Sequence, residues 1–137
     1  MRCVIDFYGP TNLLTRRLTT KNGEPTEKRR PMGDQLKVFR ISSDDNDLLR
    51  YASPVTHVTK DSPPVLIFQG RADPLVDYPQ SEELVAVLKR HGVPHEFVLL
   101  EGIGHSFDLA TWNKKPLPRD LRAVALAFLE KHMGASK

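Results

Sequence analysis

The segment Val65-Leu66-Ile67-Phe68-Gln69-Gly70-Arg71-Ala72-Asp73-Pro74 contains the pattern that decides the fold. Its first four residues are all apolar and lie between Pro63-Pro64 and Gly70, as in a strand buried on both faces of a parallel sheet. A helix is predicted to follow, because Pro79 suits a first helical position and Gly92 suits a helix end. This stretch therefore predicts a strand that is followed by a crossover helix.

Two further elements extend this unit toward the end of the chain. Phe97-Val98-Leu99-Leu100 is a second apolar run and predicts a second buried strand. The last helix is predicted from about Arg119 to His132, where apolar residues recur with helical spacing. The order strand, helix, strand, helix is that of a right-handed βαβ unit with a closing helix. Residues 53–137 are thus predicted to form a βαβα core.

The first half of the chain is less regular. Within residues 1–10, the mostly apolar run from Arg2 to Tyr8 stops at Gly9-Pro10 and predicts a third strand. Residues 11–52 are predicted to be a variable, lid-like loop that ends in a short helix from about Asp45, because long irregular connections are often lids or binding loops. The expected fold class is α/β, with about three parallel strands and flanking helices in one partial domain.

Composition narrows the function classes. The 137 residues are 39% hydrophobic and 27% charged, which is typical of a folded globular domain. No apolar run approaches the roughly 18 residues that cross a bilayer, and the first residues lack the apolar stretch of a signal peptide. We expect no membrane partner, and the compartment is not predicted.

Cysteine count and charge exclude other classes. The single cysteine, Cys3, excludes an internal disulfide and a multi-cysteine metal site, and we expect neither a metal nor another cofactor. The formal net charge of +3 is too mild to indicate a nucleic-acid partner. Basic residues do gather between Arg16 and Arg40, but they lack stacking aromatics. We interpret them as a solvated loop, with an anion- or polymer-binding surface as a weaker alternative.

Two ionisable residues follow the predicted strands directly. Asp73 comes after the strand that ends at Phe68, and His105 comes after the strand that ends at Leu100. Ligands of open α/β sheets bind outside the carboxyl ends of the strands, and these two strands are expected to be close in the sheet. An Asp–His pair at that position can act as the charge-relay half of a nucleophilic triad. Taken singly, Asp73-Pro74 also fits an ordinary turn, and His105 an ordinary loop.

Several motifs together resemble one family. Residues 53–56, 63–76 and 102–107 are similar to the C-terminal half of an α/β-hydrolase, and residues 6–13 resemble its sixth strand and the following turn. The nearest type is that of bacterial lipase/esterase-like enzymes, the feruloyl and acetyl-xylan esterases. The chain has Gln69-Gly70 where that family often has His-Gly.

The resemblance implies roles for individual residues. It makes Asp73 the acid and His105 the base of a triad that acts on a small ester substrate. Tyr8, Val76 and Phe107 are the candidate substrate-binding residues.

The nucleophile motif of the family is missing from this sequence. G-x-S-x-G does not occur in the 137 residues, and the family's oxyanion-hole loop is not found either. We therefore expect a segment of a serine ester hydrolase that carries the acid and the histidine but is inactive alone. The expected partner is a missing N-terminal half, or a second copy joined across the edge of the first strand. The alternative is a non-catalytic α/β module that binds a ligand or a partner.

Overall fold

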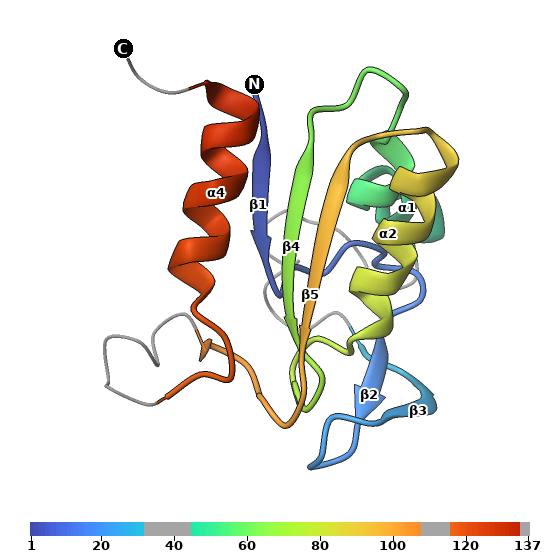
Figure 1. Ribbon diagram of the computed structural model, residues 1–137. Helices are drawn as coiled ribbons and strands as arrows, with labels where there is room; N and C mark the ends of the chain where they lie inside the picture. The colour runs from blue at the N-terminus through green and yellow to red at the C-terminus, as the bar shows by residue number, and fades with distance from the viewer. Residues whose placement is uncertain (32–44, 108–115, 135–137) are drawn as a thin grey trace.

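The computed structural model describes residues 1–31, 45–107 and 116–134, and it contains a three-stranded parallel sheet. The strands are β1 (Val4–Phe7), β4 (Val65–Gly70) and β5 (His95–Leu100), in the order β1-β4-β5. Helices flank the sheet (Figure 1). The predicted α/β class is therefore confirmed, and all three predicted strands are present.

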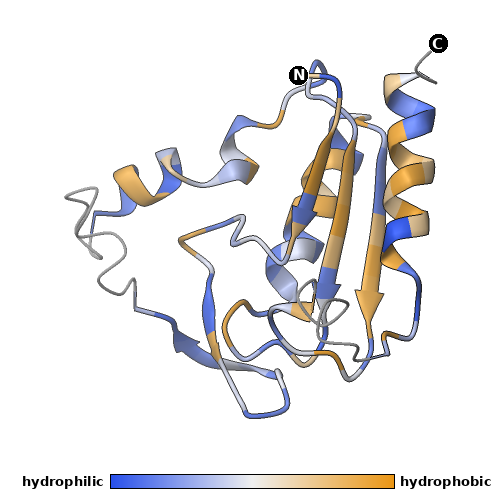
Figure 2. Cartoon of the chain, turned by 90° about the vertical axis from the view of Figure 1, so that its left-hand side faces the viewer, coloured by the Kyte–Doolittle hydropathy of each residue, from blue (hydrophilic) through white to orange (hydrophobic). Residues whose placement is uncertain are grey.

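The central strand β4 is buried on both faces, as its unbroken apolar run predicts. Leu66 and Phe68 pack with α4 (Leu121–Met133) on one face, whereas Val65 and Ile67 pack with α2 (Pro79–Arg90) on the other. Successive side chains of a strand point to opposite faces, so a strand between two helices has to be apolar throughout. Figure 2 shows this strand as a mostly hydrophobic band between the two helices.

The two long helices begin and end close to the predicted positions. Helix α2 starts at Pro79 as expected, and Gly92 follows its end in a left-handed conformation with φ +68°. Helix α4 starts at Leu121 and not at Arg119, because the carboxylate of Asp120 accepts hydrogen bonds from the backbone N–H groups of Arg122 and Ala123. Such a side-chain cap fixes the first helical residue.

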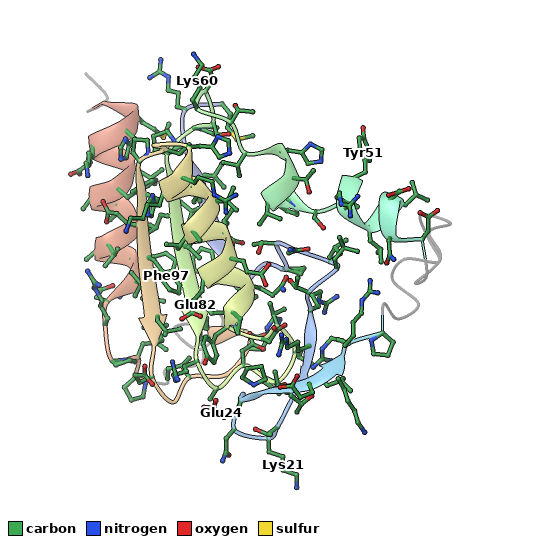
Figure 3. All side chains as sticks on the ribbon, turned by 90° about the vertical axis from the view of Figure 1, so that its right-hand side faces the viewer. Lys21, Glu24, Tyr51, Lys60, Glu82 and Phe97 are labelled. Carbon is green, nitrogen blue, oxygen red and sulfur yellow. The ribbon has the colours of Figure 1, made fainter. Side chains whose placement is uncertain are left out.

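The stretch predicted as an irregular loop contains an antiparallel hairpin. Its strands are β2 (Arg17–Thr19) and β3 (Pro25–Arg29). Local sequence patterns do not predict this hairpin, because both strands are short and polar and one begins with a proline. In Figure 3, Lys21 and Glu24 mark the outer end of the hairpin, away from the sheet.

The rest of the predicted loop divides into a described and an undescribed part. The short helix α1 (Asn46–Tyr51) is confirmed with Asp45 as its N-cap, and the 3₁₀ turn η2 (Pro54–His57) follows it. The carbonyl of the Gln80 side chain accepts from the backbone N–H groups of Thr11 and Asn12, which ties the chain after β1 to α2. Residues 32–44, the middle of the predicted lid, lie outside the described residues.

Candidate active site

The carboxyl ends of the three strands bring the predicted site residues to one edge of the sheet. Parallel pairing aligns Phe7 with Phe68 and Gly70 with Leu100. Tyr8, Asp73 and His105 follow these ends, so loops far apart in sequence meet there. We call this edge the carboxyl rim, defined by Tyr8, by residues 70–77 (the acid loop) and by residues 101–107 (the histidine loop). Figure 1 shows β1, β4 and β5 with their arrowheads toward this edge.

Asp73 and His105 are in direct contact on the rim. Nδ1 of His105 donates a hydrogen bond to Oδ2 of Asp73 over 2.7 Å. The carboxylate is fully buried, and 23% of the histidine side chain is exposed. Because Nδ1 is occupied by the carboxylate, Nε2 is the ring nitrogen that remains to exchange a proton with a reacting group. The predicted hydrogen bond between these two residues is confirmed.

The Asp73 carboxylate is held by its own loop as well as by the histidine. Its Oδ1 accepts from the backbone N–H of Leu75 over 2.8 Å and from that of Val76 over 2.9 Å. These bonds form a tight turn around the carboxylate, which explains why Asp73-Pro74 also has the sequence of an ordinary turn. The turn therefore also positions the carboxylate that contacts His105.

Gln69 supports the acid loop, which its sequence context did not predict. Its side chain is fully buried, and its Nε2 donates to the backbone carbonyls of Gly70 and Val76, each over 3.1 Å. Nε2 also lies 3.4 Å from Oδ2 of Asp73, and Oε1 accepts from the hydroxyl of Ser81 over 3.0 Å. One amide thus connects the end of β4, both ends of the acid loop and helix α2. Gln69 is a positioning residue for Asp73; its only sequence signal was its departure from the family's usual histidine.

The histidine ring is supported by aromatic side chains. The ring centroids of Tyr8 and His105 are 4.3 Å apart, and those of Tyr8 and Phe107 are 5.0 Å apart in an edge-on arrangement. Tyr8 has a φ of 45° and Ser106 a φ of 60°, which are unusual for residues other than glycine. Such left-handed conformations often occur at functional sites, where the surrounding packing holds them.

The acid and histidine loops are packed against each other through their backbones. The N–H of Arg71 donates to the carbonyl of Leu100 over 2.9 Å, and the N–H of Ala72 donates to that of Ile103 over 3.0 Å. A Cβ atom on Gly70 would come closer to the carbonyl oxygen of Ile103 than side chains tolerate. Glycine is therefore required at position 70 by close approach of the two loops.

The β2–β3 hairpin docks on the acid loop. The carbonyl of Pro74 accepts from Nη2 of Arg30 over 2.6 Å and from the hydroxyl of Thr19 over 2.9 Å. The backbone N–H of Arg17 donates to Oδ1 of Asp77 over 3.2 Å. The hairpin thus packs against the carboxyl rim and is not the freely solvated loop that we expected.

A cavity of about 830 Å³ opens beside His105. Tyr8 and Val76, two of the predicted substrate-binding residues, line it together with His105. Phe107 does not: it is 2% exposed and packs in the core with Phe68 and Phe128. The prediction of a substrate contact for Phe107 is therefore corrected, and its observed role is to support the Tyr8 ring.

The carboxylate of Asp6 has few hydrogen bonds among the described residues. Asp6, on β1, accepts from the backbone N–H of Gly9 through Oδ1, whereas its buried Oδ2 has no hydrogen-bond partner among the described residues. Burial raises the pKa of Asp6 above its ordinary value of 3.8, and the bond from Gly9 opposes this only in part. Asp6 belongs to an apolar cavity of about 520 Å³ on the β1 side, which Ile5, Leu84 and Leu88 also line.

The described residues contain neither a metal-ligand cluster nor a helix able to span a membrane. In residues 1–31, 45–107 and 116–134 there is no cluster of three or more His, Cys, Asp or Glu side chains arranged to hold a metal ion. None of the helices described there has the length and the apolarity to span a bilayer.

Two family models match the chain, and each covers more than half of it. The model described as BD-FAE matches residues 1–88, and the model of the dienelactone hydrolase family matches residues 49–129. The chain belongs to the α/β-hydrolases. The resemblance stated from the motifs is therefore confirmed, and so is its broad class of hydrolases and esterases.

Curated relatives are similar over most of this chain but are much longer. Dipeptidyl aminopeptidase BIII of Pseudoxanthomonas mexicana is 30% identical in an alignment of 137 residues that covers 96% of this chain and 18% of the relative. Esterase LipQ of Mycobacterium tuberculosis is 34% identical in an alignment of 96 residues that covers 69% of this chain and 23% of the relative. The chain spans less than a quarter of the length of either protein.

A solved structure supports the same fold. A puromycin-hydrolyzing peptidase of Mycobacterium tuberculosis superposes with a TM-score of 0.69 at 22% identity, over 99% of this chain and 19% of that one. This likeness concerns the fold, and it agrees with the parallel sheet and flanking helices described above.

Proposed function

We propose that this chain supplies the acid and the base of a serine-dependent carboxylic-ester hydrolase, with Asp73 as the acid and His105 as the base. The observation that carries the proposal is the 2.7 Å hydrogen bond between them on the carboxyl rim, beside a cavity that His105 lines. The family membership supports the reaction class.

The mechanism follows from which ring nitrogen is occupied. Asp73 holds Nδ1–H of His105 and stabilises the imidazolium that forms when Nε2 takes a proton from a serine hydroxyl. The serine oxygen attacks the ester carbonyl, a tetrahedral intermediate forms, and Nε2 returns the proton to the departing alcohol. His105 then activates a water molecule, which hydrolyses the acyl-enzyme and releases the acid.

The serine is proposed to come from a part of the enzyme outside these 137 residues. The sequence contains no G-x-S-x-G, and the chain spans only a small share of the relatives' length. A charge relay without its nucleophile and oxyanion donors has no route to an acyl-enzyme. The 137-residue chain by itself is therefore proposed to be inactive.

The test uses the coding sequence upstream of the Met1 codon. If in-frame sequence with G-x-S-x-G precedes it, the longer product is expected to react with a fluorophosphonate probe and to hydrolyse p-nitrophenyl acetate. Asp73→Asn and His105→Ala in that product are expected to lower kcat by about 10⁴-fold, the usual cost of disabling a triad. Failure of the longer product to label would overturn the proposal and favour the non-catalytic binding module. Sustained turnover by the 137-residue chain, lost in His105→Ala, would also overturn it.

We further propose that the free edge of β1 and its apolar cavity take the nucleophile-bearing half of the enzyme. Among the described strands, β1 pairs only with β4, so its other edge is open. Open apolar edges recruit other strands. Light scattering of the 137-residue chain at micromolar concentration tests this: association is expected, and Ile5→Lys should reduce it. A monodisperse 15.5 kDa species that unfolds cooperatively would contradict the proposal. A defined dimer that is lost in Ile5→Lys would also contradict it, because the partner at the β1 edge would then be a second copy of this chain and not the nucleophile-bearing half.

A further inference from the structure

Two arginines share the cavity with the proposed base. Arg16 and Arg30 line the 830 Å³ space that His105, Tyr8 and Val76 also line. None of the described residues that line this cavity is acidic. Both arginines belong to the basic stretch from Arg16 to Arg40, for which an anion-binding surface was the weaker alternative to a solvated loop.

Arg30 is held in place by the acid loop. Its Nη2 donates to the carbonyl of Pro74 over 2.6 Å, and its Nε donates to the carbonyl of Arg17 over 3.3 Å. Pro74 is the residue next to Asp73, so the position of this guanidinium is fixed relative to the Asp73–His105 pair. A guanidinium fixed by its neighbours loses little conformational entropy when it binds an anion.

Arg16 is placed where a positive charge is costly. It is the residue before β2, and partial burial together with the like charge of Arg30 lowers the pKa of its guanidinium. The Asp77 carboxylate opposes this shift but does not cancel it. Two cations facing the same partly apolar cavity favour an anion between them, because charge-assisted hydrogen bonds are stronger in a poorly hydrated site.

We propose that the ester bound in this cavity carries a second, ionised acid group, which Arg16 and Arg30 bind while the ester group faces His105. This inference rests on the proposed function, and it narrows the substrate class from small esters in general to anionic esters. A carboxylate suits the pair because a guanidinium can bind its two oxygens with two parallel N–H groups. The remaining cavity wall is apolar, with Leu18, Leu75 and Val76, and it suits a short carbon chain between the two groups.

The test compares two probes that differ at one end group, which is a carboxylate in the first and its methyl ester in the second. Binding of monomethyl glutarate and of dimethyl glutarate to the 137-residue chain is measured by calorimetry, and the shifts of the His105 ring are followed by NMR. We expect the monoester to bind at least about tenfold more tightly than the diester, with a preference that weakens as salt is added. Equal affinities, or no binding of either probe, would overturn the inference.

Variants test whether the two arginines cause the preference for the monoester. Arg16→Gln is expected to remove most of the preference, and Arg16→Lys to restore part of it. Arg90→Gln is the matched control, because it removes the same charge from an exposed position on α2. If Arg16→Gln and Arg30→Gln both keep the full preference, or if Arg90→Gln removes it equally, the inference is wrong.

The Arg30 variant needs a separate control for the hairpin. Thr19→Val removes the other donor to the Pro74 carbonyl without a change of charge. If Arg30→Gln lowers the preference for the monoester and Thr19→Val does not, the lost charge of Arg30 and not a loosened hairpin causes the change. Equal effects of the two variants would overturn the role of Arg30. Because these readouts are binding constants, they are independent of the fluorophosphonate labelling that tests the proposed function.

Discussion

The carboxyl rim and the β1 side of the same sheet differ in how their polar groups are satisfied. On the rim, the Asp73 carboxylate accepts from two backbone N–H groups and from His105, and the amide of Gln69 lies nearby. On the β1 side, the Asp6 carboxylate accepts from Gly9 alone, and its buried second oxygen has no partner among the described residues. Asp6 lies on β1 and Asp73 in the loop after β4, but among the described residues only Asp73 has partners for both carboxylate oxygens.

This difference indicates which parts of the site are formed within this chain alone. The acid, its supporting amide and the contact with the histidine are all supplied within residues 69–105. The surface around Asp6 instead combines an open strand edge with an apolar cavity, as expected of a surface that another part of an enzyme covers. The following changes test the contrast.

The largest effect is expected from Gly70→Ala on the rim. Its new Cβ would press against the carbonyls of Ile103 and Gly104 and force the histidine loop away from the acid loop. We expect a loss of about 3 kcal/mol of unfolding free energy, which is typical of overpacking against backbone, and weaker coupling between Asp73 and His105 by NMR. Denaturant titration measures the first effect.

Gly104→Ala is the matched control for that change. It lies in the same histidine loop, but its nearest atom would be the carbonyl oxygen of Ala72 at 3.7 Å, an ordinary contact. It should cost well under half as much stability as Gly70→Ala. Equal losses for the two variants would mean that close approach of the loops is not what position 70 requires.

The second effect concerns Gln69. Replacement by leucine keeps the size of the side chain but leaves the Gly70 and Val76 carbonyls and the Ser81 hydroxyl without their amide partner. Unsatisfied buried polar groups of this kind cost about 2 kcal/mol in total stability, measured by denaturant titration. Ser81→Ala, which removes one of these bonds, should cost less. The contrast with the β1 side fails if Gln69→Leu leaves both stability and the His105 ring signals unchanged.

A smaller effect is expected at Tyr8, where β1 meets the rim. Tyr8→Leu removes the ring that contacts His105 and Phe107, and we expect a loss of about 1 kcal/mol with broader NMR signals from the His105 ring. Tyr8→Phe keeps the ring and should preserve the ordered histidine. A histidine that is equally ordered in Tyr8→Leu would show that Asp73 alone fixes it.

The smallest effect is expected at Asp6, with the opposite sign. Folding raises the pKa of Asp6 above 3.8, its ordinary value. The protonated Asp6 therefore contributes its full stabilisation of the folded state below about pH 3.8, and this contribution is lost as the pH rises through the pKa that Asp6 has in the folded protein. Asp6→Asn should therefore be more stable than the unmodified chain at neutral pH, by roughly 1–2 °C in the unfolding midpoint, and the difference should vanish in acid. A destabilised Asp6→Asn at neutral pH would show that the β1 side needs this charge.

Local patterns were enough to predict the sheet and the central pair. The runs 65–68 and 97–100 are apolar at every position, and this leaves few alternatives to buried parallel strands. Once the strands are parallel, the carboxyl ends of the sheet bring Asp73 and His105 together, and the 2.7 Å contact confirms this. These predictions depend on short stretches and one general rule of topology.

The missed features depend on contacts between distant segments. The polar hairpin at residues 17–29 is held by the Pro74 carbonyl and Asp77, which no local pattern of the hairpin reveals. In the sequence, Gln69 is only a polar residue at the end of an apolar strand. Its hydrogen bonds with the Val76 carbonyl and the Ser81 hydroxyl form only when the fold brings these residues next to it. Phe107 was a candidate substrate-binding residue, whereas the fold places its side chain in the core.

The pairing of β1 with β4 also has a consequence for the order of folding. Val4 pairs with Val65, whereas Val65 pairs with His95, so the first strand closes a loop about twice as long as the second pairing does. During synthesis β1 emerges before β4, its partner, which follows about 60 residues later, and contacts this distant in sequence slow folding. The β4–α2–β5 unit is therefore expected to form before β1 joins it, so that Tyr8 reaches the histidine only after that unit has formed.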